Sequence, residues 1–317
     1  MGNHALRGIR TVFMGTPAFA VPSLRSLHAA GATIAGVVTQ PDRPSGRGHR
    51  LHESAIAAEA QRLHLPVSKP DGFKRDENHA ALQALRPDLL VVVAYGHILP
   101  KAVLDLPRLG AVNVHASLLP KYRGPAPVPA AILTGDTETG VTIMKLDEGI
   151  DTGPILSQER ESILPDDTTA TLSARLADRG ARLLIPTLEA YLAGALTPTP
   201  QDGAQASRAP LLAKEDGRIE WTMPAERIER MIRAFTPWPR AYTQWNGKQL
   251  TIHRTSVEAA PPSQPPGTVL PWRGTFGVVT GNGLLRVEEL QLEGRARLTA
   301  EAFLQGNRSI LGSLLTP

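Results

Sequence analysis

Residues 89–115 read LLVVVAYGHILPKAVLDLPRLGAVNVH, and this stretch contains two strands joined by a short helix. Residues 89–94 are all apolar, which is typical of a parallel strand buried on both faces of a sheet. A short helix is expected at 101–106, and the second strand is expected at 111–115. This order predicts two parallel strands connected by a right-handed crossover.

The same alternation extends over the first 200 residues. Strands are expected at 9–14, 33–39 and 140–146. Helices are expected at 20–30, 54–65, 75–86 and 168–193, the last interrupted near Pro186. We therefore predict an α/β fold, with a Rossmann-like, mostly parallel sheet and helices on both of its faces.

The composition changes near residue 200. Residues 195–210 have the Pro, Gln and Gly content of a linker, and all four tryptophans follow residue 209. A helix at 225–235 precedes short alternating runs at 241–245, 249–255, 268–270, 277–280 and 284–290. Such runs predict a small barrel or sandwich. The predicted organisation is a catalytic domain at 1–194, a linker at 195–210 and a second domain at 211–317.

Composition excludes several classes of protein. The 317 residues include no cysteine, which rules out disulfides, cysteine metal sites and thiol nucleophiles. No apolar stretch reaches the roughly 18 residues that a membrane span needs. Gly15 is not followed by the glycines of a dinucleotide-binding turn, and a P-loop and a G-x-S-x-G elbow are missing as well. We expect a soluble, cytoplasmic monomer that makes no contact with a membrane.

Two polar residues stand at the end of the strand at 111–115. Asn113 and His115 are two residues apart, so their side chains point to the same face of the sheet. Open α/β sheets bind ligands at the carboxyl ends of their strands. Burying an amide and an imidazole there costs free energy, which a catalytic role would explain. The alternative is that both side chains simply cap the strand end by bonding to the backbone.

A carboxylate in the segment 147–153, DEGIDTG, is a candidate partner for these residues. Asp151 follows another apolar strand and is bracketed by glycines. An amide, an imidazole and a carboxylate together suit acyl transfer to an amine, because the first two can stabilise an oxyanion while the third orients the imidazole. The alternative for Asp151 is a turn-forming role before Gly153.

The segment 39–54, TQPDRPSGRGHRLHES, is predicted to be a basic loop. Arg43, Arg47 and Arg50 suit phosphate groups, which suggests a nucleic acid or a phosphorylated substrate. The alternative is a solvated insertion. His49 and His52 have no evident third ligand, so no metal site is predicted.

Taken together, these motifs resemble the methionyl-tRNA formyltransferase family over nearly the whole chain. The matching stretches are FMGTPAFAVPSL (13–24), VVTQPDRPSGRG (37–48), VVVAYGHILPKAVLDLP (91–107), GAVNVHASLLPKYRGPAP (110–127), TGVTIMKLDEGIDTGPIL (139–156), KEDGRIEW (214–221) and IRAFTPWPRAY (232–242). The SLLP and DTG pieces are shared with other folate-dependent formyltransferases, whereas the full order is specific to this family.

The resemblance implies formyl transfer from 10-formyltetrahydrofolate to the α-amino group of methionyl initiator tRNA, without a metal. It implies that Asn113, His115 and Asp151 are catalytic. It further implies that Ser117, Leu118, Leu119 and Pro120 bind folate, and that Arg43, Arg47 and Arg50 contact tRNA. The region from about 209 would be an OB-like barrel that grips the tRNA. Pro129 departs from the family pattern, where glutamine is expected.

Two related activities stay open at this point. One is folate-dependent formylation of an amino sugar on a nucleotide, although such relatives lack the basic loop. The other is hydrolysis of 10-formyltetrahydrofolate. A non-enzymatic nucleic-acid-binding protein is a third alternative, but it leaves Asn113 and His115 unexplained.

Overall fold

The structure is a computed structural model, and it describes residues 6–45, 50–259 and 264–317. The chain forms two compact units, each built from pieces that are separate in the sequence. The first unit comprises Met1–Pro127, Glu138–Ser162 and Ser173–Pro210, and the second comprises Val128–Thr137, Ile163–Leu172 and Leu211–Pro317. The domain boundaries drawn from the sequence stay a prediction.

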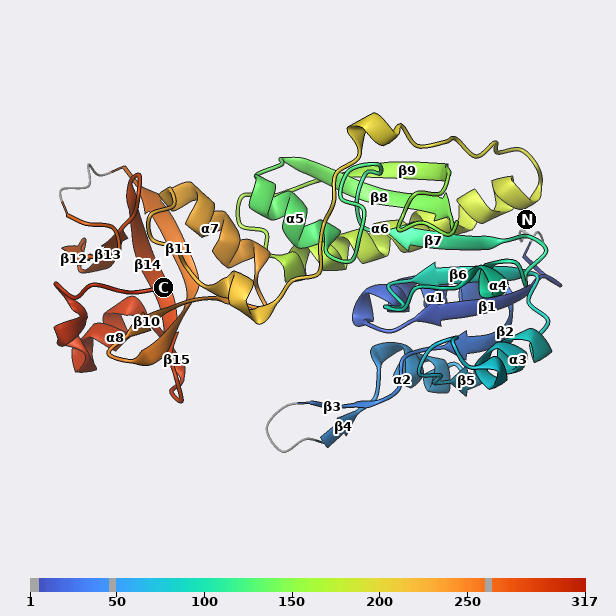
Figure 1. The fold of residues 1–317 in the computed structure, drawn as a ribbon, viewed down its shortest axis with the longest axis horizontal. Helices are drawn as coiled ribbons and strands as arrows, with labels where there is room; N and C mark the ends of the chain where they lie inside the picture. The colour runs from blue at the N-terminus through green and yellow to red at the C-terminus, as the bar shows by residue number, and fades with distance from the viewer. Residues whose placement is uncertain (1–5, 46–49, 260–263) are drawn as a thin grey trace. The chain divides into compact units, whose positions relative to one another are not determined.

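Within its described residues, the first unit contains a seven-stranded sheet of order β5-β2-β1-β6-β7-β8-β9 (Figure 1). The strands are β1 (Arg10–Gly15), β2 (Thr33–Val38), β5 (Val67–Ser68), β6 (Leu89–Val93), β7 (Ala111–His115), β8 (Glu138–Lys145) and β9 (Ile155–Ser162). Pairs from β5 to β7 are parallel, whereas β8 and β9 run antiparallel to their neighbours. The predicted Rossmann-like, mostly parallel sheet is confirmed.

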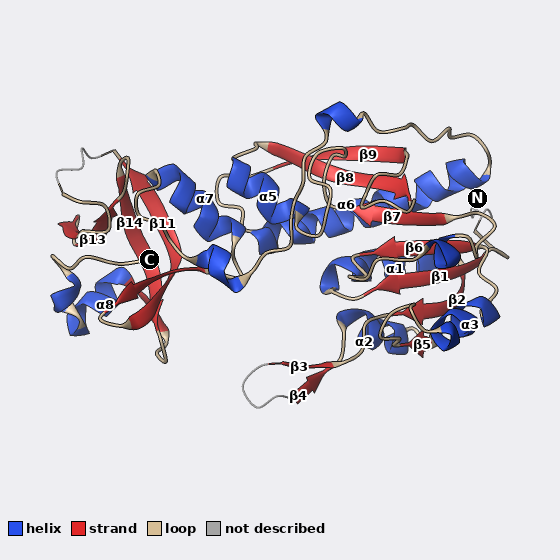
Figure 2. Ribbon diagram, in the orientation of Figure 1, coloured by secondary structure: helices blue, strands red, loops and turns tan. Residues whose placement is uncertain are grey.

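Helices cover both faces of this sheet (Figure 2). They are α1 (Val21–Ala29), α2 (Ala55–Arg62), α3 (Asp76–Ala84), α4 (Lys101–Leu104) and the long α6 (Thr169–Leu192). On one face, Leu82 of α3 and Val103 of α4 share a buried cluster with Val92 of β6. On the other face α6 packs so closely that a Cβ on Gly180 would lie 2.7 Å from Val114 Cγ1. Among the described helices, none has the length and apolar character to cross a membrane.

Helix α6 corrects one expectation, because it continues through Pro186 without interruption. Proline cannot donate the backbone hydrogen bond to the preceding turn, which favours a break. Leu184 and Leu188 on either side are fully buried. We attribute the continuity to this packing, which holds both halves of the helix against the sheet.

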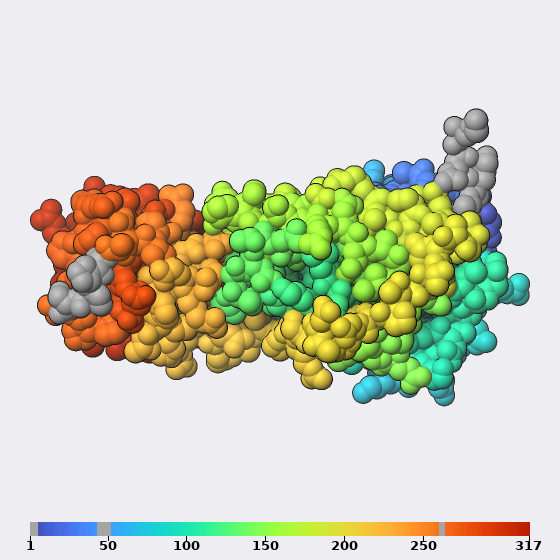
Figure 3. Space-filling view, turned by 90° about the horizontal axis from the view of Figure 1, so that it is seen from above, coloured from blue at the N-terminus to red at the C-terminus, as the bar shows by residue number. Residues whose placement is uncertain are grey.

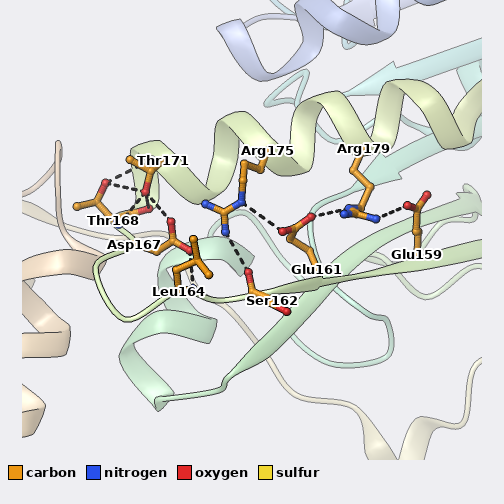
Figure 4. Close-up of polar contacts among 9 residues, drawn as sticks. All are labelled: Glu159, Glu161, Ser162, Leu164, Asp167, Thr168, Thr171, Arg175 and Arg179. Atoms are coloured by element: carbon orange, nitrogen blue, oxygen red, sulfur yellow. Dashed lines mark hydrogen bonds and ion pairs between the residues drawn. The ribbon is translucent and has the colours of Figure 1, made fainter.

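Strand β9 is attached to α6 through its charged side chains (Figure 4). Glu161 accepts hydrogen bonds from Arg175 Nε at 3.2 Å and from Arg179 Nε at 2.6 Å, and Glu159 pairs with Arg179. Residues 159 and 161 share one face of the strand because side chains alternate. A strand of composition ILSQERES is inconspicuous in the sequence because its carboxylates face arginines rather than an apolar layer.

The second unit contains α5 (Pro127–Thr134), which begins at the last residue of the first unit, and an antiparallel sheet of order β10-β11-β14-β13-β12, with β15 paired to β14. Its further elements are α7 (Ala225–Ala234), β10 (Ala241–Trp245), β11 (Lys248–Glu258), β12 (Val269–Trp272), β13 (Thr275–Val279), β14 (Leu284–Leu292), β15 (Arg297–Thr299) and α8 (Ala300–Gly306). The end of the chain closes this sheet: Leu314 forms a β-bridge with Thr268, and Thr316 forms one with Gln244. The result is barrel-like, as predicted.

Also in this unit, a short polar network precedes α6 (Figure 4). Asp167 accepts hydrogen bonds from Leu164 N at 2.7 Å and from Thr171 Oγ1 at 2.9 Å. Asp167 therefore stabilises the turn that leads into the helix, since its carboxylate satisfies donors of that turn.

Candidate active site

Asn113 lies near the end of β7 and His115 is its last residue. Both side chains are buried, with exposed fractions of 8% and 6%. In the sheet, Asn113 pairs with Val92 on one side and Met144 on the other. The polar amide therefore continues an apolar row, on the face opposite Val114 and α6. Burying a polar group at such a position costs free energy unless it is hydrogen-bonded, and this cost points to a functional reason for the amide.

The imidazole of His115 lies between two acceptors. Its Nε2 is 3.0 Å from the carbonyl oxygen of Tyr122, which can only accept, so Nε2 carries a hydrogen. Its Nδ1 is 3.7 Å from Asp151 Oδ2, within ion-pair range but beyond hydrogen-bond distance. A proton on Nδ1 would face the carboxylate. The three residues predicted from the sequence to act together thus lie at one end of the sheet.

Asp151 is held in place by its own loop and by a neighbouring one. Its Oδ2 accepts a hydrogen bond from Gly124 N at 2.8 Å. Its backbone has φ of 53°, in the left-handed region that is uncommon for non-glycine residues and that aspartate adopts more readily than most. The tight turn also needs glycine at 153, where a Cβ would lie 2.0 Å from the carbonyl oxygen of Lys145.

The turn at 117–120, sequence SLLP, is anchored to the adjacent strands. Thr142 Oγ1 donates to Ser117 O at 2.6 Å and accepts from Leu119 N at 3.1 Å. Gln158 Nε2 donates to Leu119 O at 2.8 Å and to Thr142 Oγ1 at 2.9 Å. His115, Thr142 and Gln158 are successive partners across β7, β8 and β9, so they form one row on the same face as the site.

Sequence reasoning missed Thr142 and Gln158. Thr142 is fully buried in the largely apolar segment GVTIMK. A polar residue inside such a run is the signal by which it could have been found. No comparable signal marks Gln158, because β9 is polar along its length.

The segment 201–209 was also missed, because its composition predicted a linker. Tyr122 N donates to Ser207 Oγ at 2.9 Å, and Arg123 N donates to Ser207 O at 2.8 Å. Ala209 N returns a bond to Arg123 O at 2.8 Å. The segment is therefore hydrogen-bonded to residues 122–123, beside the site. Figure 3 shows part of the segment, in yellow, at the molecular surface.

Loops after β1 and β6 meet where the strand order reverses, the place where open α/β sheets bind ligands. Thr16 Oγ1 and Gln40 Nε2 both donate to the carbonyl oxygen of Tyr95, at 2.9 and 3.0 Å. Burial raises the pKa of the Tyr95 hydroxyl to about 12, so it stays neutral at physiological pH. β7, which carries Asn113, is the next strand of the sheet after β6.

The basic loop is a two-stranded ribbon in part, which corrects the expectation of an irregular loop. Strands β3 (Arg43–Ser45) and β4 (Arg50–His52) pair in antiparallel fashion, with Ser45 opposite Arg50. The sequence of this segment shows no apolar alternation that would have predicted the two strands. Arg47 lies outside the described residues.

Both ends of the ribbon are fixed to the body of the first unit. Lys69 Nζ contacts Asp42 Oδ1 at 2.8 Å, just before β3, and Glu53 Oε1 at 3.0 Å, just after β4. The hydrogen bond to Asp42 contributes most to raising the pKa of Lys69. Thr39 and Ser54 add a hydroxyl–hydroxyl contact of 2.7 Å.

Within the described parts of the chain, no group of three or more His, Asp or Glu side chains is arranged to hold a metal ion.

Comparison with known proteins agrees with this geometry. A family model described as formyl transferase matches residues 9–188, and one described as formyl transferase, C-terminal domain, matches residues 211–308. The chain is 45% identical to the methionyl-tRNA formyltransferase of Geobacter metallireducens over 305 residues, covering 96% of this chain and 97% of that protein. It is 49% identical to the methionyl-tRNA formyltransferase of a Roseiflexus species, covering 95% and 93%. The chain belongs to the methionyl-tRNA formyltransferase family.

Solved structures that resemble this member of the family share its fold at low sequence identity. An N-formyltransferase from Helicobacter canadensis, in complex with folinic acid and dTDP-3-aminofucose, has a TM-score of 0.66 at 18% identity, covering 88% of this chain and 99% of its own. HypX from Aquifex aeolicus, in complex with tetrahydrofolic acid, has a TM-score of 0.61 at 19% identity, covering 94% and 47%. These likenesses concern the fold alone.

Proposed function

We propose that this protein transfers the formyl group of 10-formyltetrahydrofolate to the α-amino group of methionyl initiator tRNA. The observation that carries the proposal is the 45–49% identity to methionyl-tRNA formyltransferases over at least 95% of the chain. The site geometry adds support, because Asn113, His115 and Asp151 lie together at the carboxyl end of β7.

The residues present fit a formyl donor. In the reaction, the neutral amine attacks the formyl carbon and negative charge develops on the formyl oxygen. The bond from that carbon to the folate nitrogen then breaks, and the proton lost by the attacking amine is balanced by one gained by the departing folate nitrogen. Asn113 would donate a hydrogen bond to the developing oxyanion, in a buried place where such a donor acts strongly. His115 would donate to it when the formyl oxygen replaces the Tyr122 carbonyl as the partner of Nε2–H. Asp151 would orient His115 through the 3.7 Å approach to Nδ1 and stabilise positive charge on the ring.

The remaining predicted residues have supporting roles in this proposal. The turn of Ser117, Leu118, Leu119 and Pro120 would contact folate, since Thr142 and Gln158 hold it rigidly beside the catalytic row. Arg43, Arg47 and Arg50 would contact the tRNA backbone from the ribbon that Lys69 anchors.

A formylation assay with 10-formyltetrahydrofolate tests the proposal, using four acceptor conditions: methionyl initiator tRNA, methionyl elongator tRNA, a nucleotide amino sugar, and no acceptor. Formylation restricted to the initiator tRNA is expected, and its rate should fall steeply with salt because tRNA binding releases counterions. Formylation of the amino sugar alone, or equal consumption of folate without any acceptor, would replace the proposal with the corresponding alternative.

A further inference from the structure

We propose that Gln201 is a positioning residue for the catalytic aspartate. This inference rests on the proposed formyl transfer, and it assigns a catalytic purpose to the segment 201–209, which lies against the site although its composition resembles a linker.

The amide of Gln201 joins the two loops that hold His115. Its Nε2 donates to the carbonyl oxygen of Asp151 at 2.9 Å and to that of Gly153 at 2.8 Å. Its Oε1 accepts from Arg123 Nε at 3.0 Å and from Arg123 Nη2 at 2.8 Å. An amide offers two donor hydrogens and two acceptor lone pairs, so all four are used.

The position of these bonds is what links them to catalysis. Asp151 adopts a left-handed backbone conformation, and Gln201 bonds to the carbonyl of that same residue. On the other side, Arg123 lies between Tyr122, whose carbonyl faces His115 Nε2, and Gly124, whose N–H binds the Asp151 carboxylate. Gln201 therefore links the backbone of the Asp151 loop to the side chain of Arg123, the residue between Tyr122 and Gly124.

Without this amide, the Asp151 loop would lose the side-chain donor that holds its backbone carbonyl. The distance from His115 Nδ1 to Asp151 Oδ2 is already 3.7 Å, so a further displacement would weaken the electrostatic effect of the carboxylate on the ring and change its orientation. Misplacement of a catalytic group by about 1 Å can cost about 10²-fold in rate. Substrate affinities would change little, because Gln201 bonds to protein groups rather than to either substrate in this arrangement.

The test measures kcat and KM for both substrates in Gln201→Leu and Gln201→Glu, alone and combined with Asp151→Asn. Leucine removes every hydrogen bond, whereas glutamate can still bind Arg123 but cannot donate to the two carbonyls. Gln205→Leu is the matched control, because Gln205 lies in the same segment and its Nε2 bonds only to exposed Asp202, at 2.9 Å, among the contacts of the described residues. Wild-type protein serves as the baseline, so its failure to formylate tRNA would overturn the proposed function rather than this inference.

We expect both Gln201 variants to lose roughly 10- to 100-fold in kcat with nearly unchanged KM values. In the Asp151→Asn background the same changes should cost little more, because a residue that acts through Asp151 has nothing left to position. Wild-type kcat in both Gln201 variants, a change confined to KM, or an equal loss with and without Asp151 would each overturn the inference. Should Gln201→Leu fail to fold, Gln201→Glu decides the question, since it retains the contact with Arg123.

Discussion

His115 Nδ1 and Asp151 Oδ2 lie 3.7 Å apart, and the same carboxylate oxygen accepts a hydrogen bond from Gly124 N at 2.8 Å. One oxygen atom therefore faces the imidazole and also fastens the loop that carries the carbonyl on the opposite side of the ring. The charge of Asp151 and its role in local structure can be separated by a substitution that keeps an oxygen but removes the charge.

Asp151→Asn makes that separation. Its side-chain oxygen can still accept the hydrogen bond from Gly124, so the melting temperature should stay close to that of the wild type. Loss of the charge beside His115 should lower kcat by about 10²- to 10⁴-fold. The control is Asp147→Asn in the same loop, where the exposed carboxylate bonds only to Gly149 N and Thr152 Oγ1 among the described residues. If the two variants turn over equally fast, Asp151 has no catalytic role.

Removal of either proposed oxyanion donor should have a similar consequence. Asn113→Ala and His115→Ala are each expected to lower kcat by about 10²- to 10³-fold, the usual loss for one such donor. Circular dichroism would check that the sheet is intact. Met144→Leu, at the strand partner of Asn113, is the control for disturbance of the strand pair. Near-wild-type turnover in either alanine variant would contradict the assignment.

Lys69→Met tests the anchoring of the ribbon. Loss of the ammonium leaves Asp42 and Glu53 without the cation between them, although Glu53 keeps its hydrogen bond from Gln61 Nε2, and the two carboxylates should separate. We expect a several-fold higher KM for methionyl-tRNA, with the KM for folate unchanged. Lys74→Met, an exposed lysine further along the chain, provides the comparison. A rise in the KM for folate instead would show that Lys69 supports the folate site.

Glu59 should make stability depend on pH in acid. Hydrogen bonds from Arg25 and then from Arg62 lower the pKa of this buried carboxyl from the usual 4.5 to about 2. Because the pKa is depressed in the folded state, the stabilisation is fully present above pH 4.5 and is lost as the pH falls toward 2.

The comparison uses Glu59→Gln, whose free energy of unfolding should vary less than that of the wild type over this range. Glu77→Gln, at a mostly exposed residue, should keep the wild-type slope. Urea unfolding at each pH would measure these free energies. If the free energy of unfolding varies with pH equally in the wild type and in Glu59→Gln, this ion pair makes no contribution.

Gly180→Ala should destabilise the strand that carries the site. The added Cβ would lie 2.7 Å from Val114 Cγ1, between Asn113 and His115 in the chain. Overpacking of this kind costs about 1–3 kcal/mol. Gly203→Ala is the control, because nothing lies within 4 Å of its Cβ. Thermal unfolding would measure both, and equal melting temperatures would show that α6 shifts without cost.

Local patterns were sufficient to predict much of the fold. Apolar runs such as 89–94 mark buried parallel strands whatever surrounds them, because a strand covered on both faces needs apolar side chains throughout. The two-residue spacing of Asn113 and His115 placed them on one face for an equally local reason. The OB-like barrel was predicted less completely, since its closure depends on Leu314 and Thr316 bridging to strands far away in the sequence.

Contacts between residues far apart in the sequence determined the remaining features, and these contacts cannot be predicted from composition. Pro186 continues a helix because Leu184 and Leu188 are buried on either side, and β9 is a strand because its carboxylates meet arginines of α6. The clearest case is Gln201. A glutamine among Pro, Asp and Gly is typical of a linker, and only the folded chain brings its amide to Asp151 and Arg123. Residue type and periodicity specify which face a side chain takes, whereas hydrogen bonds between distant loops exist only once the chain has folded.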